Sequence, residues 1–150
     1  MGIAIGTYIK LTPSQCFQNF HADDSRLWNG ASYLYAGFGY SGSTVDLQAG
    51  NVEAQLVFAL NEMSLSVIQE VVDQRRVIEI DTVWLDPEAL TELSNYTTDR
   101  FMATGYSHDH SRLALRLSSP LDAISGDVPR RRLTTKLVGA LPSSGDITLL

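Results

Sequence analysis

The chain has 150 residues, a net charge of −6 and an apolar content of 44%. This length is typical of one domain with a substantial core, and the apolar content argues against disorder. The acidic charge argues against nonspecific binding to nucleic acid, and no apolar run reaches the ~18 residues that would span a bilayer.

The first thirty residues carry little hydrophobic periodicity, and turn signals stand at Thr12-Pro13-Ser14 and from Asp23. Trp28-Asn29-Gly30 predicts a tight turn in which glycine supplies a positive φ. The β-forming residues that follow predict a strand over residues 31–38. Three glycines around Phe38 and Tyr40 then predict a loop over residues 39–44.

A change of hydrophobic period marks the middle of the chain. Alternating apolar residues predict a strand over residues 51–59. Apolar residues four apart then predict a helix at about residues 61–75, and Asn61 is placed to cap it by accepting a backbone N–H. The apolar stripe expected to pack this helix on the sheet consists of Met63, Val67, Ile68 and Val71.

Strands dominate the next part of the chain. Residues 77–85 form the clearest strand pattern, and Asp86-Pro87 stops it because proline cannot donate to a sheet ladder. Residues 88–95 are consistent with a short helical turn or a loop. Residues 99–106 and 112–117 predict the two arms of a hairpin, joined by a turn at 107–111.

These elements predict a mainly β protein. The spacing of strands by turns favours an antiparallel β-sandwich or a split β-barrel, with one α-helix inserted at about residues 61–75. We expect residues 1–150 to form a single domain. Its β-barrel core spans about residues 1–118, and an extended C-terminal arm spans about residues 119–150.

His108-Asp109-His110 is the one histidine pair of the sequence, and two imidazoles with a carboxylate could ligate a divalent metal. Ordinary turn chemistry explains the same residues, because an aspartate supports the tip of a hairpin. The single cysteine, Cys16, excludes a cysteine-rich metal centre within one chain. We therefore predict no metal, no organic cofactor and no enzymatic activity.

Glu79 and Asp81 share one face of the predicted strand and could form an acid/base pair. Ile78 and Ile80 alternate with them and are expected to face the core. The alternation therefore predicts that both carboxylates lie on a solvated face.

Three consecutive arginines stand out in this acidic chain, and they favour contact with the acidic surface of a neighbouring subunit. A proline before them keeps the last strand from continuing the ladder, so the arm is expected to leave the barrel there. A head-to-tail contact of this kind generates a ring when its rotation closes. The predicted interface residues are Pro120, Asp122, Pro129, Arg130, Arg131 and Arg132.

Three segments carry a resemblance to a known family. They are strand Val52–Phe58 leading through Asn61 to the helix, strand Val77–Asp86, and Leu117–Asp122 followed by Val128–Arg132. Through them the run from Gly50 to Leu141 resembles the tail-tip and baseplate hub proteins of tailed bacteriophages. It is most similar to the family of minor tail protein L and its small single-domain relatives, which share a distal-tail-like barrel.

The resemblance implies a structural role in the virion, after synthesis in the host cytoplasm. It implies a baseplate hub or distal-tail adaptor ring that joins the tail tube to the central hub or spike proteins. A hexamer is expected because phage tail tubes are hexameric, and a trimer is the alternative. Viral DNA would pass through the channel without specific binding, and no membrane is involved. The chain lacks the C-terminal cysteines of minor tail protein L, so no iron–sulfur cluster is expected.

Two other functions stay open. A small metal-dependent hydrolase would use His108, Asp109 and His110, and would hold a stoichiometric metal ion. A stand-alone β-sandwich module could bind carbohydrate, and sugar would then quench tryptophan fluorescence. Its aromatic platform would consist of Trp28, Tyr33, Tyr35, Phe38 and Tyr40.

Overall fold

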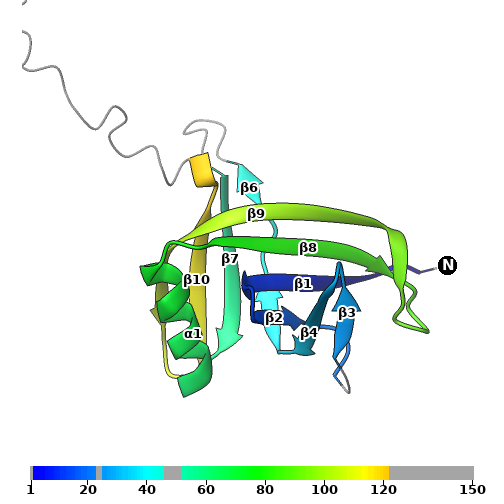
Figure 1. Cartoon of the computed structure of the whole chain (residues 1–150), viewed down its shortest axis with the longest axis horizontal. Coiled ribbons are helices and arrows are strands. Elements are labelled where there is room, and N and C mark those ends of the chain that lie inside the picture. The colour runs from blue at the N-terminus through cyan, green and yellow to red at the C-terminus, as the bar shows by residue number, and fades with distance from the viewer. Residues whose placement is uncertain (1, 23–24, 46–51, 122–150) are drawn as a thin grey trace, which may run out of the picture.

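A computed structural model describes residues 2–22, 25–45 and 52–121 of the chain. Within these ranges the backbone forms ten strands and one helix (Figure 1). In chain order they are β1 (Ala4–Thr12), β2 (Gln15–Gln18), β3 (Arg26–Trp28), β4 (Ala31–Tyr35), β5 (Phe38–Tyr40), β6 (Thr44–Val45), β7 (Val52–Ala59), α1 (Glu62–Asp73), β8 (Val77–Leu85), β9 (Glu92–His108) and β10 (Arg112–Ser118).

The strands form one sheet in the order β3-β4-β2-β1-β8-β9-β10-β7-β5, and β6 also pairs with β7. β4 and β5 follow each other in the chain, yet β4 pairs with β2 and β5 pairs with β7. The sheet therefore wraps around until Ala36 and Gly37 bridge its two sides. The predicted mainly β fold with one inserted helix is confirmed. Pairing is antiparallel, as expected, except between β2 and β4, which run parallel.

The main core lies inside this wrapped sheet and is covered by α1. Val67, Ile68 and Val71 of the helix are buried in it, as the stripe predicts. The helix begins where predicted because Asn61 caps it: its Oδ1 accepts from the Ser64 backbone N–H at 2.7 Å. The prediction that Met63 packs the helix on the sheet is wrong, because its side chain is 73% exposed. It lies in the first turn, at the mouth of a groove instead of under the sheet.

A second, smaller core lies on the opposite face of the same strands. The β3–β4 hairpin covers it, and it contains Tyr8, Cys16, Tyr33, Val83 and Leu85. β1 contributes to both cores, because Tyr8 faces the second core while Ile9 and Leu11 face the first. A strand that is buried on both faces shows no apolar–polar alternation. The first thirty residues therefore hold three strands, β1, β2 and β3, although their sequence shows little hydrophobic periodicity.

Several boundaries differ from the sequence-based expectation. The Asn29–Gly30 turn is confirmed, with φ of 47° and 80°, and joins β3 to β4. The strand expected over residues 31–38 is broken at Ala36–Gly37, and Gly39 and Tyr40 of β5 and Thr44 of β6 fall in the expected loop. β9 begins at Glu92, not at residue 99, because it pairs with β8 as far as Leu85. No helix in the described ranges is long and apolar enough to cross a membrane.

Candidate interaction surfaces

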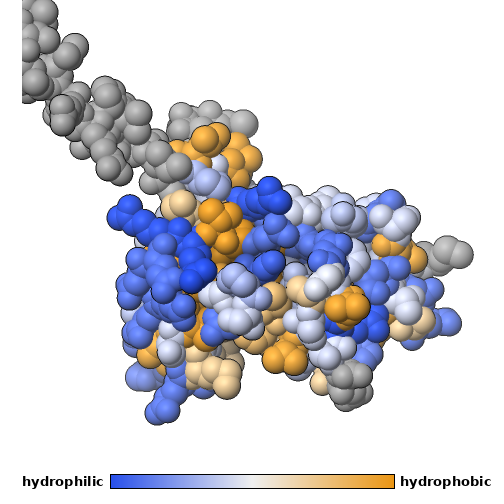
Figure 2. Space-filling view, viewed as in Figure 1, coloured by the Kyte–Doolittle hydropathy of each residue, from blue (hydrophilic) through white to orange (hydrophobic). Residues whose placement is uncertain are grey.

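Exposed hydrophobic side chains lie at several places on the surface. On the face seen in Figure 2 they form separate patches among polar side chains, and two of these patches lie over β3 and β4. The exposed leucines of these strands are Leu27 and Leu34. Ile5 and Trp84 pair across β1 and β8, and they are 67% and 40% exposed. Hydrophobic side chains scattered in this way are common on protein surfaces and do not by themselves mark an interface.

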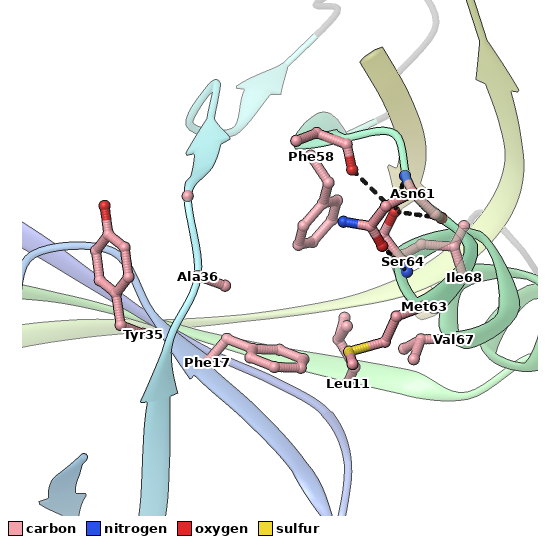
Figure 3. A pocket seen from close by; sticks show the side chains of 12 residues that line it. Leu11, Phe17, Tyr35, Ala36, Phe58, Asn61, Met63, Ser64, Val67 and Ile68 are labelled. Carbon is pink, nitrogen blue, oxygen red and sulfur yellow. Dashed lines mark hydrogen bonds between the residues drawn. The ribbon is translucent and has the colours of Figure 1, made fainter. Parts of the chain in front are cut away.

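An apolar groove lies at the start of α1. It has a volume of about 280 Å³ and lies between the helix and the β4–β5 connection (Figure 3). Figure 3 shows the side chains of Leu11, Phe17 and Met63 converging in it, with the Asn61–Ser64 cap at its rim. Other lining residues are Ala36, Phe58 and Val67.

A second, shallower hollow of about 530 Å³ lies at the break in the sheet. The two spaces share four lining residues, which are Tyr35, Gly37, Phe58 and Ala59. The hollow runs along β5 and reaches Arg112. Because they share these residues, we refer to the two spaces together as the β5 groove.

A polar cluster lies under the β3–β4 hairpin. Asp81 is only 2% exposed, and its carboxylate accepts from Trp28 Nε1 at 2.7 Å and from Thr98 Oγ1 at 2.6 Å. The prediction that Asp81 lies on a solvated face is therefore wrong, although Ile78 and Ile80 are buried as expected. The second core on that face is the physical reason, because it covers the strand on both sides.

A second set of polar contacts closes the edge of this core. The Tyr8 hydroxyl donates to the Glu92 carboxylate, and Arg26 Nη2 donates to Glu92 Oε2 at 3.1 Å. Burial alone would raise the pKa of Glu92, but the Tyr8 hydrogen bond and Arg26 outweigh it, so that pKa is lowered. Burial, followed by the adjacent Glu92, raises the pKa of Tyr8. The cluster therefore keeps Glu92 ionised and Tyr8 neutral. Its hydrogen bonds join β1, β3 and β9.

The five aromatic residues of the carbohydrate hypothesis do not form one platform. Trp28 stacks on Tyr8 at 5.0 Å, and Tyr33 is buried in the same core. Phe38 belongs to the main core, and the Tyr40 hydroxyl donates to Asp99 at 3.0 Å. Tyr35 alone among the five is largely exposed.

The His108-Asp109-His110 segment forms the end of β9 and its turn. One Asp109 carboxylate oxygen accepts from the backbone N–H groups of Ser111 and Arg112, both at 2.8 Å. These bonds hold the pKa of Asp109 below its usual value. Within residues 2–22, 25–45 and 52–121, no group of three or more His, Cys, Asp or Glu side chains could hold a metal ion.

Of the predicted interface residues, the structure describes Pro120. Asp122, Pro129, Arg130, Arg131 and Arg132 lie outside the described residues. The Ser119 N–H donates to the Val52 carbonyl at 3.0 Å, so the chain leaves the sheet at the first residue of β7. The β5 groove lies at the other end of β7, beside Ala59.

The fold and surfaces define a small, mainly β protein with one inserted helix and an apolar groove. No protein-family model matches the chain, and no curated protein matches it.

The hydrogen bonds of Glu92 with Tyr8 and Arg26 predict that the protein loses stability in acid. A carboxylate whose pKa is lowered on folding stabilises the protein above its unfolded pKa, and that contribution is lost as pH falls through the folded value. Glu92→Gln should therefore lower the free energy of unfolding at pH 7 by about 1 kcal/mol. When unfolding is measured by urea titration at pH 3, the difference in free energy of unfolding between this variant and wild type should be smaller than at pH 7. Glu88→Gln, at an exposed position, serves as the control. If the difference in unfolding free energy between Glu92→Gln and wild type did not change with pH, this role of Glu92 would be refuted.

Proposed function

We propose that this protein is a structural subunit of a phage tail. It forms a baseplate hub or distal-tail adaptor ring that joins the tail tube to the central hub or spike. The observation that carries the proposal is the order of its elements. A strand (β7), an Asn61-capped helix (α1) and a strand (β8) follow one another, and β10 closes the run after β9, in the order that the resemblance to tail-tip proteins implies.

The charge distribution supports assembly through the C-terminal segment. Residues 1–121 hold seven Lys and Arg against fourteen Asp and Glu, a net charge of −7. Residues 122–150 hold four basic and three acidic residues, a net charge of +1. Opposite charge favours contact between this segment and the body of an identical neighbour. Such a contact is heterologous, and it closes into a ring at the correct rotation.

In this proposal the ring has six copies, with three as the alternative, and sits in the virion between the tail tube and the spike. Viral DNA passes through the channel without specific contacts. The acidic body agrees with this, because nonspecific binding needs a basic face.

Light scattering of the full chain tests the ring. We expect a mass six times the 16.5 kDa of one chain. Replacing Arg130, Arg131 and Arg132 together with alanine should convert it to monomers that stay folded, because each buried arginine–carboxylate contact costs about 2–5 kcal/mol when truncated.

The matched control removes three arginines from the body instead: Arg75, Arg76 and Arg100. It changes the net charge equally and should leave the ring intact. Rings of normal mass and normal particle infectivity in the Arg130–Arg132 variant would show that the arginines are only solvated. A wild-type chain that stays monomeric at every concentration would refute the ring itself.

A further inference from the structure

We propose that Asn29 is a site of spontaneous deamidation, and that its conversion to a carboxylate loosens the hold of Asp81 on the β3–β4 hairpin. The reaction consumes water and needs no cofactor and no second protein. It takes place in a turn of the single chain, so it does not depend on the proposed function.

The Asn29–Gly30 pair is the place in the sequence where this reaction meets the least steric hindrance. Deamidation begins when the backbone nitrogen of the following residue attacks the side-chain carbonyl carbon of an asparagine. A following glycine has no Cβ to obstruct that approach. The chain has five asparagines, and Asn29 is the one that precedes a glycine.

The structure leaves this pair accessible. Both residues are exposed, and they join β3 to β4. Their φ angles of 47° and 80° are both positive, as a two-residue type I′ turn requires. Among the described residues no hydrogen bond involves the Gly30 N–H, and a Cβ built on Gly30 would meet no atom within 4 Å. The attacking nitrogen is therefore free, and Gly30 has open space in which to rotate toward the Asn29 side chain.

The reaction consumes one water molecule and releases one ammonia molecule. The Gly30 nitrogen forms a bond to Asn29 Cγ, the bond from Cγ to Nδ2 breaks, and the proton of the Gly30 N–H leaves with the ammonia. Water then opens the resulting ring at one of its two carbonyl carbons. One opening gives aspartate. The other gives isoaspartate, in which the backbone runs through Cγ and is longer by one methylene.

The amide that is lost lies against the buried carboxylate that anchors the hairpin. Asn29 Nδ2 donates to Asp81 Oδ2 at 3.5 Å, and the same oxygen accepts from Trp28 Nε1 at 2.7 Å. Asp81 is only 2% exposed, so water screens its charge poorly. Deamidation replaces the Asn29 donor with a second negative charge beside Asp81, and two carboxylates at this separation disfavour each other's ionised form.

Trp28 connects this change to the second core. Its ring stacks on Tyr8 at 5.0 Å and packs edge-on against Tyr96 at 5.2 Å. Isoaspartate has a further effect, because an extra backbone methylene does not fit a two-residue turn whose ends pair as Trp28 and Ala31. Both products therefore loosen the hairpin that covers this core.

Peptide mass spectrometry of the full chain tests the site. After incubation at mildly alkaline pH, which favours the deprotonated backbone nitrogen, the peptide that contains Asn29 should gain about one mass unit. Asn95 is the internal control, because it is also exposed but precedes Tyr96. It should remain unconverted over the same time.

Matched variants test the consequence for the hairpin. Asn29→Asp should lower the melting temperature by several degrees and change the tryptophan fluorescence, because Trp28 is less firmly held. Asn95→Asp adds the same charge at an exposed position of β9 and should change neither. Asn29→Gly keeps a residue that accepts positive φ but carries no amide. Its melting temperature should not fall during the incubation, whereas that of wild type should.

Two results would overturn the proposal. One is conversion of Asn29 no faster than that of Asn95. The other is an Asn29→Asp variant with the melting temperature and fluorescence of Asn95→Asp. If Asn29→Asp does not fold, the converted fraction of the incubated wild-type chain, separated by ion exchange, supplies the same comparison with the unconverted fraction. The mass of the assembly plays no part in these measurements, so either failure would leave the proposed function standing.

Discussion

Val71→Asp is expected to destabilise the protein by more than about 4 kcal/mol, a large part of the roughly 5–15 kcal/mol that stabilises a typical folded domain. Val71 has no exposed surface, and it lies where α1 packs into the main core. An aspartate there would be buried among apolar side chains such as Ile68, with no partner for its charge. Burying an unpaired charge is among the most costly changes a core can undergo.

Met63→Asp is the control for this prediction, because it adds the same charge to the same helix. Met63 is 73% exposed and lies in the first turn, where the helix dipole favours a negative charge. Its free energy of unfolding in urea should stay within about 0.5 kcal/mol of wild type. Equal stability of the two variants would contradict the packing of α1 through Val71.

Asp81→Ala should have the second largest effect, a loss of roughly 2–6 kcal/mol. Its carboxylate is the acceptor for Trp28 Nε1 and Thr98 Oγ1, at 2.7 and 2.6 Å. Removing it leaves these two donors without that acceptor in the second core, at about 1–3 kcal/mol each. The β3–β4 hairpin should loosen, because Trp28 is one of its anchors.

Urea unfolding and tryptophan fluorescence measure this effect. Asp73→Ala removes an exposed carboxylate near the end of α1 and should change stability little. Asp81→Asn keeps one acceptor oxygen and should fall between wild type and Asp81→Ala. If Asp81→Ala were as stable as Asp73→Ala, the carboxylate would not hold the hairpin in place.

The local elements of this fold can be predicted from the sequence alone. Asn61, the four-residue apolar spacing and the alternation in β8 and β10 place α1 and its flanking strands close to their observed ends. The Asn29–Gly30 turn follows from the φ preferences of its residues. Each of these signals depends on neighbours within a few residues, so no knowledge of the rest of the chain is needed.

The tertiary structure decided the features that depend on distant pairing. β1 carries no periodic signal because it is covered on both faces, by α1 and the main core on one side and by the β3–β4 hairpin on the other. The strand pattern alone predicts that Asp81 is exposed to solvent, but in the structure the β3–β4 hairpin covers it. The break at Ala36–Gly37 arises because β4 and β5 pair with different strands, and this break positions the β5 groove. Such contacts join residues far apart in sequence, so no local pattern encodes them.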